Sequence, residues 1–157
     1  MACITDKPLS LATSVDQVAL EARAKSLTTR SIKTTSKRAA LHLSIRCMDL
    51  TTLEGADTPG KVASLCQKAI RPDPTNLAVP PVAAVCVYPE MVDYAVAATA
   101  GTGVKVASVA GAFPSGLSRL SVRLDDISDA VARGAHEIDI VLNRSAFLTG
   151  DYNLVMD

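Results

Sequence analysis

Two aspartates stand inside apolar segments, where a charged side chain is costly to bury. Asp139 lies in the run EIDIVLN (137–143), and Asp49 lies in the run IRCMDL (45–50). Acids are rarely buried without a partner or a chemical task. One such acid is usually explained by backbone amides or an arginine, but two in similar settings favour a shared site. A buried carboxylate beside a lysine can transfer protons, and the pair predicts this chemistry.

Other residues with chemical potential give weaker signals. His42 and His136 stand alone, so we expect structural or surface roles for both. The segment Gly-Thr-Gly at 101–103 ends a predicted helix, and no dinucleotide-binding glycine motif follows the first strand. The four cysteines form no C-x-x-C pair, which is typical of free thiols in a reducing compartment, so we expect a cytoplasmic protein. They are Cys3, Cys47, Cys66 and Cys86.

The segments that must position the acids alternate between strand and helix patterns from residue 45 onward. Short apolar runs bounded by proline or glycine predict four strands, and amphipathic runs predict helices between them. The helix predicted at 118–134 has an apolar stripe that we expect to face inward: Leu120, Leu124, Ile127 and Val131. The strands are expected at 45–50, 82–89, 104–113 and 137–143, and the other helices at 57–70, at 90–100 and after Gly150.

Repeated strand–helix units predict an α/β fold of parallel strands joined by crossover helices. An open doubly wound sheet and a (β/α)₈ TIM barrel both satisfy this order. The barrel needs eight units and about 250 residues, whereas this chain supplies about four units. If the fold is a barrel, residues 44–157 form its first half, incomplete at the C-terminus. Residues 1–43 are expected to form an N-terminal tail and a helical lead.

In both architectures, ligands bind at the carboxyl ends of parallel strands. We therefore expect the polar residues near the strand ends to lie together. These are Asp49 with Thr51 on the first strand, Cys86 on the second and Asp139 on the fourth.

The composition excludes several classes of partner. The formal net charge is zero, with sixteen basic and sixteen acidic residues, so no overall field favours nucleic acid or an anionic membrane. Aromatic residues make up only 3% of the chain, which weakens any platform for stacking bases. No apolar run reaches the roughly 18 residues of a transmembrane helix. We predict neither a nucleic-acid nor a membrane partner.

Four segments in order resemble the N-terminal half of deoxyribose-phosphate aldolases, in the long form of eukaryotes and some bacteria. They are MDLTTLEGADTPGKVASLCQKA, VAAVCVYPEMV, VKVASVAGAFPSG and GAHEIDIVLNRSAFLTGDY. The resemblance implies a (β/α)₈ barrel that uses no metal or organic cofactor. It also implies a phosphorylated sugar substrate, 2-deoxy-D-ribose 5-phosphate, which is cleaved reversibly to D-glyceraldehyde 3-phosphate and acetaldehyde. In this family a lysine amine forms a Schiff base with the sugar carbonyl.

The same resemblance assigns roles to four residues. Asp139 matches the aspartate that works with a lysine and water in proton transfer, and Asp49 matches the aspartate that supports this relay. Thr51 lies where the family contacts substrate, and Cys86 matches a cysteine that lines the site. The family's reactive lysines lie on its sixth and seventh strands, and no lysine here matches them. The lysines present are Lys7, Lys25, Lys33, Lys37, Lys61, Lys68 and Lys105.

The sequence therefore predicts a class I aldolase fold whose first half, alone, has little or no activity. A second hypothesis is a non-catalytic half-barrel that binds a partner or self-associates as a homo-oligomer. A third is a small flavodoxin-like domain that binds a phosphorylated ligand. The absence of a glycine-rich first turn counts against the third hypothesis.

Overall fold

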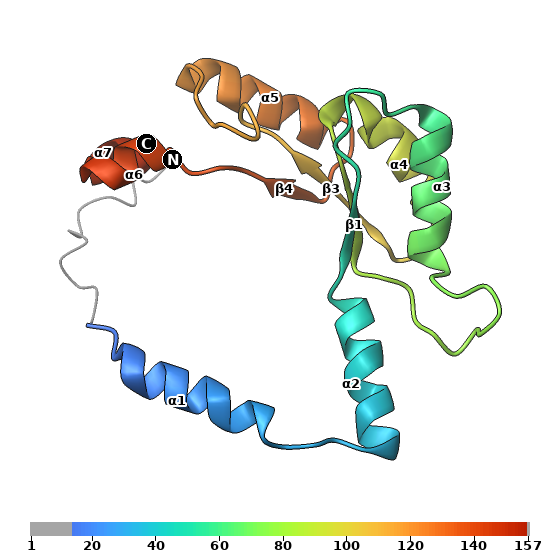
Figure 1. Cartoon of the computed structure of the whole chain (residues 1–157). Coiled ribbons are helices and arrows are strands. Elements are labelled where there is room, and N and C mark those ends of the chain that lie inside the picture. The colour runs from blue at the N-terminus through green and yellow to red at the C-terminus, as the bar shows by residue number, and fades with distance from the viewer. Residues whose placement is uncertain (1–13, 157) are drawn as a thin grey trace.

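The computed structural model describes residues 14–156, and its centre is one sheet of four parallel strands. The strand order follows the chain, β1-β2-β3-β4, and each neighbouring pair is parallel. This confirms the predicted α/β architecture of successive strand–helix units (Figure 1). The strands are β1 (Asp49–Thr51), β2 (Ala84–Val87), β3 (Lys105–Val109) and β4 (Glu137–Asp139).

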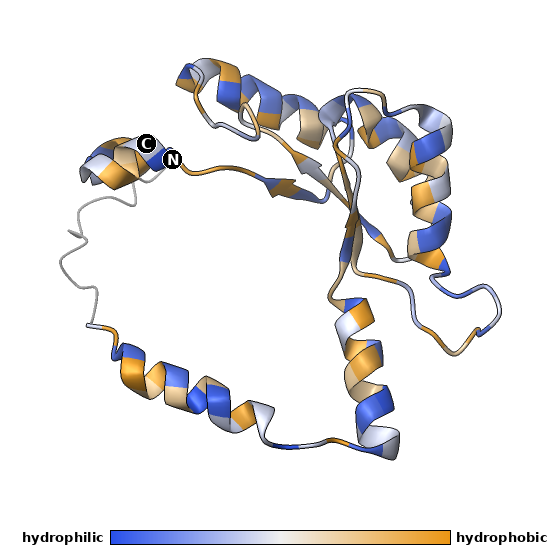
Figure 2. Cartoon of the chain, viewed as in Figure 1, coloured by the Kyte–Doolittle hydropathy of each residue, from blue (hydrophilic) through white to orange (hydrophobic). Residues whose placement is uncertain are grey.

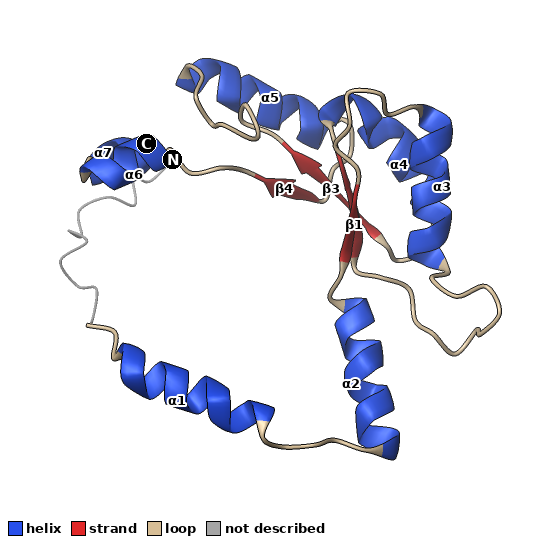
Figure 3. Ribbon diagram, viewed as in Figure 1, coloured by secondary structure: helices blue, strands red, loops and turns tan. Residues whose placement is uncertain are grey.

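Helices connect the strands and cover one face of the sheet, as Figures 1 and 3 show. The connecting helices are α3 (Pro59–Ile70), the short 3₁₀ helix η2 (Pro89–Met91) with α4 (Val92–Thr99), and α5 (Leu120–Ala132). The opposite face carries no helix in the part of the chain that the structure describes. Two helices precede the sheet, α1 (Gln17–Thr28) and α2 (Thr34–Arg46), and two follow it, α6 (Arg144–Thr149) and α7 (Tyr152–Met156).

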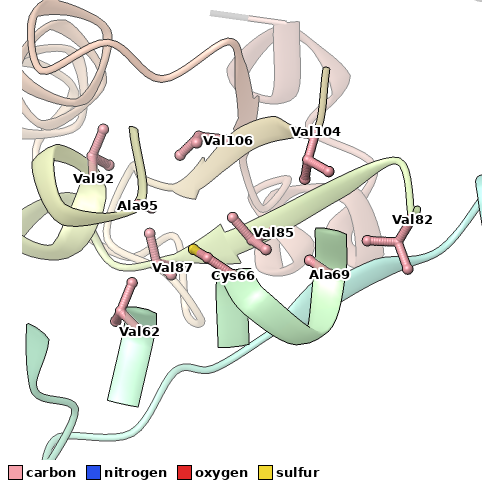
Figure 4. Close-up of a cluster of buried hydrophobic side chains, with 10 residues drawn as sticks. All are labelled: Val62, Cys66, Ala69, Val82, Val85, Val87, Val92, Ala95, Val104 and Val106. Carbon is pink, nitrogen blue, oxygen red and sulfur yellow. The ribbon is translucent and has the colours of Figure 1, made fainter. Parts of the chain in front are cut away.

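The core lies between β2 and the helices α3 and α4 (Figure 4). The first helix of this pair begins where expected, because the Thr58 hydroxyl caps it by accepting from the Lys61 amide at 3.3 Å and Pro59 occupies its first turn. Its stripe of Val62, Cys66 and Ala69 is fully buried. The buried residues that meet it are Val82, Val85, Val87, Val92, Ala95, Val104 and Val106.

The two central strands are buried on both faces, whereas the outer strands are half exposed. All four residues of β2 are buried, and a continuous apolar run is typical of a parallel strand covered on both faces. In β1 and β4 only the middle residue is partly buried, and its two neighbours are exposed. The side chains therefore divide between a helix-covered face and an open face.

The first strand begins later than predicted. Ile45 and Arg46 end α2, and Cys47 and Met48 link this helix to β1, so Asp49 opens the strand. Helical hydrogen bonding continues into the link, since the Met48 amide donates to the Ile45 carbonyl at 3.1 Å. Ile45 packs against the core from a helical position, which explains why the apolar run at 45–50 is not all strand.

The fourth strand is shorter than predicted. It ends at Asp139, and residues 140–142 lie outside any helix or strand. Asn143 then caps α6 by accepting a hydrogen bond from the Ala146 amide at 3.1 Å. This helix was not predicted from the sequence.

The predicted inward stripe of α5 is wrong. Leu120, Leu124 and Val131 are 41–54% exposed, and the fully buried residue of this helix is Ala130. The reason is polar: Asp126 accepts hydrogen bonds from the backbone amides of Gly111 at 2.7 Å and Ala112 at 3.4 Å. These bonds turn the Asp126 side of the helix toward the loop after β3 and turn the leucines outward.

Arg133 holds the other end of α5 to its neighbours. Its guanidinium binds Asp129 at 2.7 Å, Asp93 of α4 at 3.0 Å and Glu90 of η2 at 3.4 Å. The carboxylates are more than half exposed, so each pair stabilises the fold only modestly. Together they connect α5 to α4 and η2.

Hydropathy varies over short distances along every helix, including α1 and α2 (Figure 2). Across residues 14–156, we find no helix with the length and apolar character that crossing a membrane requires.

Replacing Val85 with aspartate should strongly destabilise the fold. Val85 is fully buried in β2, so an unpaired carboxylate there should cost about 3 kcal/mol or more of the free energy of unfolding. Urea denaturation measures this loss. The matched change Val131→Asp, at a position 53% exposed, should have a small effect. Equal losses at the two positions would contradict the assignment of the core.

Candidate active site

The strand register places the four predicted site residues on one face of the sheet. Thr51 lies opposite Cys86, and Asp139 lies opposite Val109, which is two residues beyond Ala107, the partner of Cys86. Asp49 shares the face of Thr51 because alternate strand residues point the same way. The structure thus brings Asp49, Thr51, Cys86 and Asp139 together on the face without helices.

The thiol of Cys86 lies within the electrostatic influence of both aspartates. Burial raises its pKa most, and the carboxylates of Asp139 and then Asp49 add to the effect, so that the pKa reaches about 11. The backbone of Val109 and the side chain of Thr51 act in the opposite direction. At neutral pH the Cys86 thiol is therefore uncharged and is not a nucleophile. It forms a small apolar part of the surface between the two carboxylates.

Both aspartates are exposed, contrary to the prediction that they are buried. They lie on the outer strands and point to the face that no described helix covers, so water solvates them. Within residues 14–156, neither carboxylate has a hydrogen-bond or ion-pair partner. The backbone of Asp139 is nevertheless fixed, since its carbonyl accepts from the Ala110 amide at 3.0 Å.

An apolar cluster that the sequence analysis missed adjoins the acids. Cys86, Ala107 and Val109 are almost fully buried on this face. Three partly buried side chains pack against them, Leu53, Tyr88 and Phe113, each from the loop that follows a strand. Tyr88 and Phe113 lie at the ends of the predicted strands 82–89 and 104–113, and Leu53 follows the first predicted strand, which was the available signal. The site therefore combines an acidic part with an apolar wall.

Asp57 organises the loop between β1 and α3, beside Thr51. Its side chain is 3% exposed and accepts from the Thr52 hydroxyl at 2.9 Å and the Glu54 amide at 3.1 Å. The Lys61 ammonium binds the same carboxylate at 2.6 Å and is the main cause that holds the pKa of Asp57 below its usual value. This ion pair attaches the loop to the first turn of α3.

No lysine of the described residues stands beside both aspartates. Lys61 is paired with Asp57, and Lys105 opens β3 in register with Ala84, at the amino end of the strands. The position of Lys7 lies outside the described residues. Lys25, Lys33, Lys37 and Lys68 lie on or between the helices α1, α2 and α3.

His136 has the structural role that was expected. Its Nδ1 accepts from the Val106 amide at 3.1 Å, and its own amide donates to the Val106 carbonyl at 2.8 Å. The residue thereby attaches the chain before β4 to β3. Among residues 14–156, no group of three or more His, Cys, Asp or Glu side chains could hold a metal ion.

Curated relatives match most of this chain. The human deoxyribose-phosphate aldolase is 42% identical over 138 residues, and the mouse protein of that name is 43% identical over the same length. The chain is homologous to the deoxyribose-phosphate aldolases. The matches cover 82% of this chain and 43% of each relative, so the chain spans less than half the length of these relatives. No family model matches the chain.

Solved structures of aldolases agree with this homology. An aldolase named QR15 superposes with a TM-score of 0.61 at 32% identity, covering 72% of this chain and 47% of that one. The deoxyribose phosphate aldolase of Aeropyrum pernix, described as a tetramer, gives a TM-score of 0.54 at 25% identity with the same coverage. The four strands thus form part of an aldolase-type (β/α) fold.

Removing the charge of Asp139 should make the Cys86 thiol more reactive. With a pKa of about 11, Cys86 should be alkylated by iodoacetamide at pH 8 far more slowly than the exposed Cys47. Asp139→Asn removes a charge that opposes the thiolate, so labelling of Cys86, followed by peptide mass spectrometry, should be a few-fold faster. Asp125→Asn on the outer surface of α5 is the control. Equal rates in the two variants would contradict the proximity of Asp139 and Cys86.

The same raised pKa predicts a loss of stability in alkali. A thiol that ionises near pH 11 in the fold and at about 9.0 in the unfolded chain favours folding below pH 9. This contribution should disappear as the pH rises from 9 through 11. Urea unfolding of Cys86→Ser should therefore show a weaker decline of stability over this range than the original chain, and an identical decline would contradict the shift.

Replacing Asp57 with asparagine should destabilise the fold in a pH-dependent way. The lowered pKa of Asp57 contributes stability above about pH 4, which is lost as the pH falls through the depressed value. Asp57→Asn should therefore unfold at lower urea than the original chain at pH 7, and the difference should shrink toward pH 3. Asp125→Asn should show no such convergence. A difference that stays constant with pH would exclude the ion pair with Lys61 as its cause.

Proposed function

We propose that this chain supplies one side of a deoxyribose-phosphate aldolase active site. The reaction is the reversible cleavage of 2-deoxy-D-ribose 5-phosphate to D-glyceraldehyde 3-phosphate and acetaldehyde. The observation that carries the proposal is the placement of Asp49, Thr51, Cys86 and Asp139 on one sheet face in a chain homologous to these enzymes. The described thiols are unpaired, which fits a reducing cytoplasm as the location.

Asp139 is the proton-transfer group of this proposal. It is the last residue of β4, at the carboxyl end of the strands, where barrel enzymes place their reacting groups. Cleavage of the C2–C3 bond requires that the C3 hydroxyl lose its proton and that C2 gain one after the bond breaks. A carboxylate with a bound water can carry both protons in turn.

The other three residues bind the substrate or support the groups that react with it. Asp49 opens β1, further from the carboxyl ends than Asp139, and supports the relay by its charge. Thr51 ends β1 and offers a hydroxyl to the substrate, while Cys86 and the neighbouring apolar cluster exclude water from one side. Exclusion of water strengthens every electrostatic interaction in a site.

The nucleophile of the reaction has to come from outside the described residues. Schiff-base formation needs an uncharged amine at the substrate carbonyl. Lys61 is paired with Asp57 at 2.6 Å, and Lys105 lies at the opposite end of the strands from Asp139. We therefore expect the acids and a binding wall from the described residues, and the amine from a part of the active site outside them.

Complementation tests the function. The 157-residue chain alone should give no aldolase turnover and no borohydride-trapped adduct with acetaldehyde. Co-expression with the part of the human relative that the chain does not match should restore turnover, measured by the release of glyceraldehyde 3-phosphate. Asp139→Asn should then lower turnover by at least about 100-fold, in line with loss of acid–base catalysis.

Two controls make this test specific. Asp125→Asn, on the outer surface of α5, should keep the restored activity. Lys105→Ala should keep it as well, because this amine is not the nucleophile. A trapped adduct on Lys105, or restored activity that survives Asp139→Asn, would refute the assigned roles.

A further inference from the structure

The loop between β3 and α5 begins with two consecutive residues in the left-handed region. Gly111 has a φ of 74° and Ala112 has a φ of 63°. This region suits glycine but is unfavourable for alanine, because the Cβ atom comes too close to the following carbonyl oxygen. Such a conformation persists only where the surrounding contacts fix it, and it is found most often at functional sites.

Asp126, on the helix α5, supplies the contact that fixes these two residues. Its Oδ2 accepts hydrogen bonds from the Gly111 amide at 2.7 Å and from the Ala112 amide at 3.4 Å. Hydrogen bonds to a charged acceptor are about twice as strong as those between neutral groups. The bonds therefore attach the start of the loop to a helix that follows it in the chain.

No cation competes for this carboxylate in the part of the chain that the structure describes. Every ion pair among residues 14–156 is made by Lys61 or Arg133. Arg123 lies one turn earlier on the same helix, but its Nε is buried without a hydrogen-bond partner. The negative charge of Asp126 is thus available to the two loop amides.

Asp126 does little for the helix that carries it. It lies in the middle of α5 (Leu120–Ala132), so its carboxylate caps neither end. Aspartate is also among the poorer helix formers. The favourable interactions of this side chain are therefore those with the loop.

The fixed residues lead directly to Phe113, which belongs to the apolar wall of the candidate site. Phe113 packs against the buried cluster around Cys86. The Gly116 amide donates to the Ala112 carbonyl at 2.9 Å and closes a turn around Phe113. A change in the backbone at Gly111 or Ala112 would therefore redirect the Phe113 ring.

We infer that Asp126 is a positioning residue of the aldolase site, whose carboxylate holds residues 111–113 so that Phe113 closes the apolar wall over Cys86. Its link to catalysis rests on the proposed function, whereas the closure of the wall is measurable without it. Asp126 acts through the loop and is not itself a member of the site. A closed wall keeps water from one side of Asp139, which strengthens the electrostatic interactions there.

Alkylation of Cys86 in the 157-residue chain reports whether the wall is closed. Burial is the main cause that raises the pKa of this thiol to about 11, so opening the wall should move the midpoint of its reaction with iodoacetamide toward 9.0. The gain in thiolate outweighs the lower nucleophilicity of that thiolate, so Asp126→Ala should be labelled at pH 8 at least about tenfold faster than the original chain. Asp126→Asn keeps an acceptor oxygen for the loop and should restore most of the slow rate. Asp125→Ala, at the exposed neighbouring position, should leave the rate unchanged.

A double substitution separates an effect through Phe113 from a general loosening of the fold. Phe113→Ala should itself speed the labelling of Cys86. Adding Asp126→Ala should then change the rate less than about twofold, because the ring that Asp126 positions is already absent. The urea midpoint of each variant measures general loosening.

Hydrogen exchange in the original chain provides a test that does not depend on a folded Asp126→Ala variant. The amides of Gly111 and Ala112 should be protected, because both are bonded to a side chain of the folded helix. Exchange of these amides at the rate of free loop amides would overturn the proposal.

Turnover after complementation with the unmatched part of the human relative tests the link to catalysis. Asp126→Ala should lower kcat/KM for 2-deoxy-D-ribose 5-phosphate at least about tenfold, as expected when part of a site is displaced. Asp126→Asn should keep most of the activity, and Asp125→Ala should keep all of it.

Four results would overturn the proposal. They are unchanged labelling in Asp126→Ala, equal acceleration in Asp125→Ala, additive effects of Asp126→Ala and Phe113→Ala, and full turnover of the complemented Asp126→Ala enzyme. Complementation that gives no turnover with the original chain would instead overturn the proposed function and with it the catalytic role of Asp126. The labelling of Cys86 would still decide whether Asp126 places the wall.

Discussion

The packing of α3 and α4 against one face of β2 determines the two-sided character of the whole sheet. Val85 and Val87 point into this contact, where Val62, Cys66, Val92 and Ala95 enclose them without exposure. Because side chains alternate along a strand, the same contact forces Cys86 to the other side. The parallel register then carries this division to β1, β3 and β4. The location of every candidate site residue follows from which residues of β2 are buried by helices.

The face of the sheet without helices can carry charged side chains that the helix-covered face cannot. A carboxylate is tolerated on β1 and β4 because water reaches it there, whereas a charge directed at α3 or α4 would be unpaired in the core. Cys86, between the two acids, is too small to cover them and remains a neutral thiol. Acids and an apolar wall thus coexist on one face, because the larger hydrophobic cluster lies on the helix-covered side and the smaller one on the open side.

The sequence predicted the features that depend on local signals. The parallel order was predicted from the alternation of strand and helix patterns, and a helix was predicted at 57–70, where Thr58 caps α3 and Pro59 opens it. The start of β1 was misplaced because Ile45 is apolar in either a helix or a strand, and only its contact with the core decides between them. The orientation of α5 was also misjudged. The bonds from Asp126 to Gly111 and Ala112 join residues about fifteen positions apart, which no local pattern reveals.

The roles of the four candidate site residues stay a prediction, and the environment predicted for the two acids was wrong. Asp49, Thr51, Cys86 and Asp139 do share a face, but the expected burial of the acids required a layer that the described residues do not contain. A solvated carboxylate is a poor proton-transfer group compared with one in a dry site, because water already satisfies it. Aldolase chemistry would therefore need this face to be covered by the part of the active site that brings the amine.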